Sequence, residues 1–236
     1  MNLQGNKLTW LGHATFRIET KDGVVIYLDP WLNNPLCPEN EKDPKKCDLV
    51  LCTHGHFDHI ADAVQLAKKH NPTVVGIFEL CSWLEKKGAK QISPMNKGGT
   101  QEVAGVKITM VNAIHSCGIT EDDGSIVYGG EACGYVLRLA DGRSLYFAGD
   151  TNVFSDMALI ERLYRPELAF LPIGDLFTMS PKEAALACSL LQPKKVIPMH
   201  FGTFPALTGR PEELAELAKP TGVEIWPLEP GKTMKW

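Results

Sequence analysis

Short apolar runs typical of β-strands alternate with amphipathic helical patterns along the whole chain. Three such runs come first, and Asp22-Gly23 between the second and third favours a tight hairpin turn. Because helical patterns separate many of the later runs, the chain is predicted to have a mixed α/β fold. The predicted strands are Lys7–Trp10, Thr15–Glu19, Val24–Leu28, Asp48–Cys52, Val74–Phe78, Val106–Ala113, Gly134–Leu139, Ser144–Ala148, Lys195–Pro198 and Val223–Trp226.

The helical segments carry recognisable start and stop signals. The segment Ile60–His70 is apolar on one face and ends before Asn71-Pro72, because the residue that precedes a proline avoids the α region. The sequence Ser180-Pro181-Lys182-Glu183 has the form of a capping box with proline at the first helical position, which predicts a helix start. Further helices are predicted over Glu79–Lys87, Ser155–Tyr164 with a serine cap, and Pro211–Lys219.

The composition is typical of a globular protein, with 236 residues of which 44% are hydrophobic and 22% charged. A chain of this size can bury a full core, so we predict a single domain over residues 1–236. No stretch approaches the roughly 18 consecutive apolar residues of a membrane helix, so no membrane association is expected. The first residues show no basic stretch followed by an apolar one, so the predicted location is the cytoplasm.

Charge and cysteine content disfavour several other classes of protein. The net charge is −4 and no basic run exceeds two residues, so a nucleic-acid partner is not expected. The seven cysteines are odd in number and include no CxxC pair, which argues against a zinc ribbon, a redox dithiol and a disulfide framework. We expect most of them to be reduced, partly buried thiols.

The segment Thr53–His59 holds three histidines and one aspartate directly after an apolar strand. In an extended segment, residues two apart point the same way, so His54 and His56 can converge on one point. Asp58 and His59, beyond the bend, can face a second point nearby. The alternative is a polar loop with surface histidines, but the chain has only seven histidines and such clustering by chance is improbable. Imidazole and carboxylate together suit zinc, iron or manganese.

Three further candidate ligands, His115, Asp150 and His200, each follow a predicted strand. The carboxyl ends of strands are where α/β folds usually build their sites. We therefore predict a site for two metal ions, in which Asp150 bridges both ions. The first ion would take His54, His56 and His115, and the second Asp58, His59 and His200.

These motifs resemble those of the metallo-β-lactamase superfamily, whose HxHxDH signature is matched by His54–His59. A later histidine, a Gly-Asp150-Thr segment and a late histidine follow in the family's order. Other segments resemble a bacterial branch of metal-dependent hydrolases related to ascorbate-6-phosphate lactonase and to N-acylphosphatidylethanolamine-hydrolysing phospholipase D. They are Trp10-Leu-Gly-His13-Ala-Thr, Asp29-Pro, Gly-Asp175-Leu-Phe-Thr-Met179 and Pro198-Met-His200-Phe. The resemblance implies a four-layer αββα sandwich with a dinuclear site at one edge of the sheets.

The differences from other branches of the superfamily narrow the expected chemistry. Redox members resemble this pattern but carry glutamate where this chain has His56, which favours hydrolysis over reduction of oxygen or nitric oxide. The branches that process RNA add a long arm or a large inserted domain, and neither is visible in this sequence.

The predicted activity is metal-dependent hydrolysis of a small ester, lactone or phosphodiester. Two divalent transition-metal ions, zinc first with manganese or iron as alternatives, would lower the pKa of a shared water toward ~7. Asp58 and Asp150 are expected to orient the resulting hydroxide, and Asp150 to supply the leaving group with a proton. Two alternatives stay open, a nuclease or phosphodiesterase acting on nucleic acid and a metal-binding scaffold without activity. No ligand is missing, which disfavours the scaffold.

Several residues keep two interpretations at this point. His13 is either a hydrogen-bonded histidine at the join of two strands or a catalytic residue at the rim of the pocket. Asp29 either holds a ligand histidine through its second nitrogen or forms a plain turn. Asp175 and Thr178 either line the pocket or cap the next helix. Four apolar residues form a substrate wall or belong to the core of their loops, namely Phe177, Met179, Phe201 and Phe204. A homo-oligomer is permitted but not required.

Overall fold

The computed structural model describes residues 5–236 and contains two seven-stranded β-sheets and a separate two-stranded hairpin. The first sheet consists of β1 (Lys7–Trp10), β2 (Phe16–Glu19), β3 (Val25–Leu28), β4 (Leu49–Leu51), β5 (Thr73–Ile77), β6 (Ile92–Met95) and β16 (Thr233–Lys235). The second sheet consists of β7 (Thr100–Val103), β8 (Val106–Asn112), β11 (Cys133–Arg138), β12 (Ser144–Phe147), β13 (Leu168–Pro172), β14 (Lys195–Met199) and β15 (Glu224–Ile225). The hairpin pairs β9 (Gly118–Thr120) with β10 (Ile126–Tyr128).

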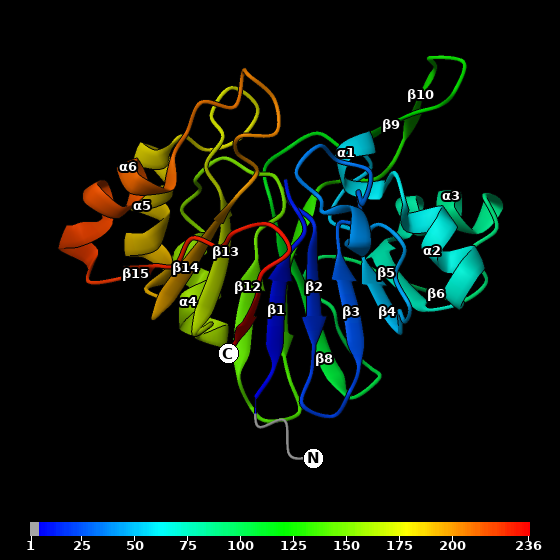
Figure 1. Cartoon of the computed structure of the whole chain (residues 1–236), viewed down its shortest axis with the longest axis horizontal. Helices are drawn as coiled ribbons and strands as arrows, with labels where there is room; N and C mark the ends of the chain where they lie inside the picture. The colour runs from blue at the N-terminus through cyan, green and yellow to red at the C-terminus, as the bar shows by residue number, and fades with distance from the viewer. Residues whose placement is uncertain (1–4) are drawn as a thin grey trace.

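Helices cover the outer sides of the two sheets, which gives the four layers of an αββα sandwich (Figure 1). The helices are α1 (Phe57–Ile60), α2 (Ala63–His70), α3 (Phe78–Lys86), α4 (Met157–Tyr164), α5 (Pro181–Leu191) and α6 (Pro211–Ala218), with single 3-10 turns at Glu39–Glu41 and Lys219–Thr221. The helices α2 and α3 lie beside the first sheet and α4, α5 and α6 beside the second, while the β9–β10 hairpin projects away from the body of the molecule (Figure 1).

The direction of the strands brings several strand ends to one edge. The strands β3, β4, β5 and β6 are parallel neighbours in the first sheet. In the second sheet β12, β13 and β14 are parallel, and β8 runs the same way because β11 is antiparallel to both β8 and β12. The loops that follow β8, β12 and β14 therefore leave the second sheet at the same edge.

The core lies between the two sheets and is held by aromatic side chains from both. Phe16 of β2 packs edge-to-face against Phe170 of β13, with ring centroids 4.7 Å apart, and lies 6.1 Å from the ring of Phe147 of β12. All three side chains are fully buried. Because Phe16 belongs to the first sheet and its two partners to the second, this cluster fixes how the sheets face one another.

The predicted strands are all present, with ends within one residue of the prediction. The capping box is also confirmed, since Ser180 Oγ accepts from the backbone N–H of Glu183 and the Glu183 carboxylate accepts from the N–H of Ser180. The prediction that Ser155 caps the helix α4 is wrong, because α4 starts after Asp156 and has no side-chain cap.

The predicted continuous helix over residues 60–70 is wrong as well. The chain forms the single turn α1, breaks at Ala61-Asp62 and resumes as α2. The break has a cause, because the Asp62 carboxylate accepts from the backbone N–H groups of Leu32 and Asn33, and Asp62 N–H donates to the carbonyl of Pro30. Asp62 thus forms hydrogen bonds with the segment after β3, and the helix is interrupted between α1 and α2.

All seven cysteines are free, as expected for most of them, and all seven are buried. Burial raises the pKa of the Cys133 and Cys81 thiols, the latter to about 12, so these groups stay protonated and inert. Among residues 5–236, no helix is both long and apolar enough to cross a membrane.

Candidate metal centre

The loops at one edge of the sandwich bring residues from both sheets together. His54 and His56 lie in the extended segment after β4, and Asp58 and His59 lie on α1. The second sheet contributes the three residues that follow β8, β12 and β14, namely His115, Asp150 and His200.

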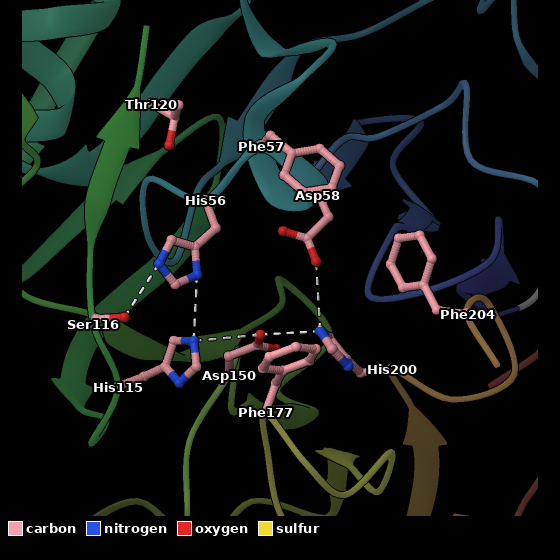
Figure 2. Close-up of a pocket in the computed structure, with 10 residues that line it drawn as sticks. All are labelled: His56, Phe57, Asp58, His115, Ser116, Thr120, Asp150, Phe177, His200 and Phe204. Atoms are coloured by element: carbon pink, nitrogen blue, oxygen red, sulfur yellow. Dashed lines mark hydrogen bonds and ion pairs between the residues drawn. The ribbon is translucent and has the colours of Figure 1, made fainter. Parts of the chain in front are cut away.

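Three imidazoles form a first cluster. The Nε2 atom of His54 lies 3.0 Å from Nδ1 of His56. The same nitrogen of His56 lies 3.3 Å from Nε2 of His115 (Figure 2). Burial lowers the pKa of all three side chains, that of His54 most strongly. They are therefore neutral at pH 7, which is the state in which imidazole binds a metal ion.

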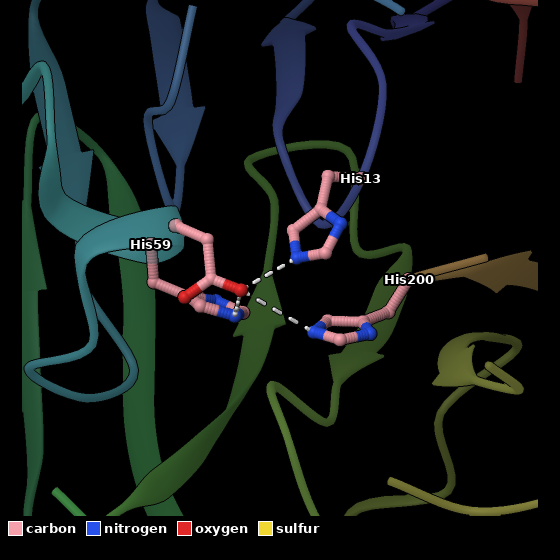
Figure 3. A group of neighbouring side chains, drawn as sticks. His13, His59 and His200 are labelled. Carbon is pink, nitrogen blue, oxygen red and sulfur yellow. Dashed lines mark hydrogen bonds and ion pairs between the residues drawn. The ribbon is translucent and has the colours of Figure 1, made fainter. Parts of the chain in front are cut away.

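A second cluster contains Asp58, His59, His200 and also His13 (Figure 3). Asp58 Oδ2 lies 2.8 Å from His13 Nε2, 3.7 Å from His200 Nε2 and 3.8 Å from His59 Nε2. One side-chain atom of each of the four residues lies within 4.8 Å of those of the other three. Three of these side chains are buried, and Asp58 faces the pocket described below.

Asp150 lies between the two clusters. Its Oδ2 atom is 3.0 Å from Nε2 of His200 and 3.2 Å from Nε2 of His59. The same oxygen is 3.7 Å from Nε2 of His115 and 3.9 Å from Nε2 of His54, both in the first cluster. Asp150 therefore occupies the place that a bridging carboxylate would need.

Several buried polar atoms in this cluster have no hydrogen-bond partner among the described residues. They are Nε2 of His59, both ring nitrogens of His200, and Oδ1 of Asp150. Buried polar groups are almost always paired, so the unpaired Nε2 atoms of His59 and His200, which both face Asp150, need an explanation. Imidazole nitrogens and carboxylate oxygens at these separations fit a divalent metal ion, which would satisfy the Nε2 atoms of His59 and His200 and an oxygen of Asp150 together.

The charges of the second cluster also fit a cation. Burial opposes the charged form of His200, but the Asp150 and Asp58 carboxylates outweigh it and raise the pKa of His200 to about 9. The same balance raises the pKa of His59 well above 6.5, while His200 and His59 hold that of Asp150 well below its usual range despite its burial. A divalent cation that displaced the two histidine protons would leave the charge of the cluster unchanged.

The buried carboxylate of Asp29 orients one imidazole of each cluster, His59 directly and His54 through Thr53. The His59 Nδ1–H group donates to Asp29 Oδ2 over 2.7 Å, which leaves Nε2 of His59 to face the centre. Thr53 donates its hydroxyl to the same oxygen over 2.6 Å and its N–H to Oδ1 over 2.7 Å. That hydroxyl also lies 3.0 Å from Nδ1 of His54. Asp29 therefore orients His54 of the first cluster as well, through Thr53. Of the two interpretations of Asp29, the structure therefore favours the one in which it orients a histidine.

His13 lies behind Asp58 rather than at the rim of the pocket. Its side chain is fully buried, with Nδ1 2.9 Å from the hydroxyl of Thr203 and Nε2 2.8 Å from Asp58 Oδ2. Burial lowers the pKa of His13 to about 4, against the hydrogen bond to Asp58. His13 is thus a neutral hydrogen-bond donor to a site carboxylate.

The clusters open into a cavity of about 600 Å³. Its lining combines candidate metal ligands with three phenyl rings and two hydroxyls, as Figure 2 shows: His56, Phe57, Asp58, His115, Ser116, Thr120, Asp150, Phe177, His200 and Phe204. Of the four candidate wall residues, Phe177 and Phe204 line the cavity, whereas Met179 is fully buried and Phe201 stacks on Trp10 at 5.1 Å. Asp175 and Thr178 do not line the cavity.

The backbone at the site is strained. His13, Asp29 and His200 have φ values of 53°, 43° and 57°, in the left-handed region that non-glycine residues rarely adopt. Gly149, at φ 62°, lies so close to Thr53 that an added Cβ would come within 2.7 Å of the threonine Cβ. Such strain persists where the surrounding structure fixes it, and it clusters at functional sites.

Several site residues carried no signal in the sequence. Thr53 and Thr203 orient histidines, Ser116 Oγ lies 3.2 Å from Nε2 of His56, and Trp31 packs behind two of the pocket phenyl rings. Of these, only Thr53 could have been suspected, because it directly precedes the histidine motif.

The sequence model of the beta-lactamase superfamily domain matches residues 25–201. The chain therefore belongs to the beta-lactamase superfamily, as its motifs predicted, and its two sheets and outer helices have the corresponding fold. A solved metallo hydrolase named Igni18, from Ignicoccus hospitalis, is 35% identical with a TM-score of 0.86, and the match covers 99% of each chain.

Relatives within the superfamily are more similar still. A "UPF0173 metal-dependent hydrolase" of Solibacter usitatus is 60% identical over 231 residues, which cover 98% of this chain and 100% of the relative. A protein of Methanopyrus kandleri with the same description is 49% identical over 232 residues, covering 96% and 98%. This chain is accordingly a metal-dependent hydrolase. The particular relation to the lactonase and phospholipase branches stays a prediction.

Proposed function

We propose that the protein hydrolyses a small ester, lactone or phosphodiester with the help of two divalent metal ions. The observation that carries this proposal is the position of Asp150, whose Oδ2 atom lies within 3.9 Å of ring nitrogens of both clusters. One ion would be held by His54, His56 and His115, the other by Asp58, His59 and His200, and both by Asp150. Five imidazoles and two carboxylates suit zinc first, with manganese or iron as alternatives.

Bound divalent ions would supply a nucleophile at neutral pH and polarise the bond to be cleaved. The chain's own groups would orient the reactants. The Asp58 carboxylate faces the pocket and accepts the hydrogen bond of His13, so its orientation is fixed before substrate arrives. We assign to Asp58 the orientation of the attacking oxygen, and to Asp150, which also lines the pocket, the transfer of the water's proton to the leaving group.

Metal content tests the proposal directly. We expect elemental analysis of metal-replete protein to give two transition-metal ions per chain, falling to about one in His56→Ala and in His200→Ala, because each removes a ligand of one ion. His70→Ala is the matched control, since His70 ends α2 and belongs to neither cluster. One ion or none in the unaltered protein would overturn the two-ion scheme, and hydrolysis that survives chelation would overturn metal dependence.

His13 is expected to act as a positioning residue for Asp58. His13→Asn removes the imidazole but tolerates the left-handed backbone, and we expect its kcat to fall by roughly 10- to 100-fold, as for other groups that orient ligands. His13→Gln, whose amide can donate toward Asp58, should recover part of the loss. Both variants should keep two metal ions and the thermal unfolding midpoint within a few degrees. A kcat equal to that of the unaltered protein in His13→Asn would refute this role.

A further inference from the structure

We propose that this site takes neutral carbonyl substrates, that is carboxylic esters or lactones with an apolar portion, in preference to phosphorylated or otherwise anionic ones. The inference rests on the proposed hydrolytic function and narrows its substrate. In the reaction, a water oxygen would bond to the carbonyl carbon, the carbon–oxygen bond of the ester would break, and the departing alcohol oxygen would take the water's proton.

The first support is an aromatic wall, defined as Phe57, Phe177 and Phe204 (Figure 2). Phe57 belongs to α1, while Phe177 and Phe204 come from the loops that follow β13 and β14. Phe57 and Phe177 are each 59% exposed although they face one cavity. Exposed apolar surface that converges on a cavity is typical of a ligand site, because covering it removes the rings from water.

Neighbouring side chains and a strained loop fix the position of the aromatic wall. Trp31 contacts Phe57 edge-to-face with ring centroids 5.5 Å apart and stacks on Phe204 at 5.8 Å, so the two rings are held in place from behind. Phe177 follows Asp175 and Leu176, which have φ values of 65° and 51°, an unusual pair of left-handed non-glycine residues. The Asp175 N–H donates to the carbonyl of buried Met179 and anchors this strained loop.

The second support is the charge of the lining. No lysine or arginine lies among the ten described residues that line the cavity. Sites for phosphate groups usually present arginine or lysine, whose donors match the phosphate oxygens. Opposite Phe204 the cavity instead presents the hydroxyls of Ser116 and Thr120, which suit uncharged oxygens (Figure 2). A charged substrate group that lay against the aromatic wall, and not at the proposed metal ions, would lose hydration without gaining a partner.

A matched pair of reporters tests the inference. The 4-nitrophenyl ester of hexanoic acid and the mono-4-nitrophenyl ester of adipic acid share the leaving group, the reacting carbonyl and the chain length. They differ only in a terminal carboxylate. We expect zinc-loaded protein to favour the neutral ester by roughly tenfold in kcat/KM. Across the acetate, butyrate and hexanoate esters, kcat/KM should rise about two- to fourfold for each added methylene.

Substitution of the wall should change this preference. Phe177→Arg places a cation at the pocket mouth and should reduce the preference at least about fivefold, because the adipate ester then finds a partner. Leu163→Arg is the matched control, since Leu163 is 67% exposed on α4 and lines no part of this cavity. It should leave the ratio unchanged.

The outcomes separate this inference from the proposed function. The inference would be overturned if the adipate ester were hydrolysed as well as or better than the hexanoate ester, or if Phe177→Arg left the ratio of their kcat/KM values unchanged. In either case, hydrolysis that is lost on chelation would still support the proposed function. Greater acceleration of bis(4-nitrophenyl) phosphate than of the hexanoate ester, each relative to its uncatalysed rate, would also overturn it. If neither the esters nor the phosphodiester were hydrolysed above the rate of chelated protein, the proposed function would itself fall.

Discussion

Replacing Asp150 by asparagine is expected to lower turnover by about 10³-fold while the protein stays folded. The reason is that one carboxylate oxygen lies 3.0 Å from His200 Nε2 and 3.2 Å from His59 Nε2, and also faces the first cluster. Asparagine keeps the shape of the side chain but removes its charge, so no bridging anion remains. The chemistry and at least one metal site should therefore fail together.

The measurement is kcat for an activated ester on metal-loaded protein, together with metal content and the thermal unfolding midpoint. Asp156→Asn is a suitable control, because Asp156 is an exposed aspartate beside α4 that makes no contact with the site. It should retain full activity. An Asp150→Asn variant with unchanged kcat would remove Asp150 from the mechanism, and with it the two-ion scheme.

The second large effect is expected from Asp29→Asn, which should weaken metal binding by about 10- to 100-fold. The amide cannot accept three hydrogen bonds in the same way, since one of its ends is a donor. The amide N–H₂ group would face either the Thr53 N–H, which now donates to Oδ1, or the His59 Nδ1–H and the Thr53 hydroxyl, which now donate to Oδ2. Because Thr53 also contacts His54, we expect both ions to bind more weakly.

Competition with a metal indicator measures these affinities. Asp62→Asn is the matched control, because Asp62 is also a buried aspartate that accepts backbone hydrogen bonds, yet it contacts no imidazole. A loss of metal affinity in Asp29→Asn but not in Asp62→Asn would identify the hydrogen bonds of Asp29 with His59 and Thr53 as the cause. Equal metal affinities in the Asp29→Asn and Asp62→Asn variants would show that metal binding by His59 does not depend on its hydrogen bond to Asp29.

The residues that the structure gathers at the site could largely be predicted from the sequence, for a physical reason. Metal-binding side chains are polar groups in a few chemical types, and those after β4, β8, β12 and β14 each followed a recognisable apolar strand. His54 and His56 also carry their geometry in their spacing, because alternate residues of an extended segment share a side.

The parts that could not be predicted depend on contacts between distant segments. Asp29 reaches His59 and Thr53 only because β3 and β4 are parallel neighbours, and the position of His13 behind Asp58 follows from the loop that carries Thr203. The break at Asp62 has the same origin, since its carboxylate serves the loop after β3 and not its own helix. The hairpin strands β9 and β10 are three residues each, too short for a clear pattern.

The pairing of β16 with β1 has a consequence for biosynthesis. The last strand, Thr233–Lys235, covers the edge of β1, and the N–H of Asn6 donates to the carbonyl of Trp236 over 2.8 Å. Because β1 is synthesised before β16, the edge of β1 stays uncovered until β16 emerges from the ribosome. Both clusters also take candidate metal ligands from the second sheet, the last of them His200 after β14. Neither cluster can therefore assemble before these strands of the second sheet have been made, and chains that lack β16 expose a sheet edge open to aggregation.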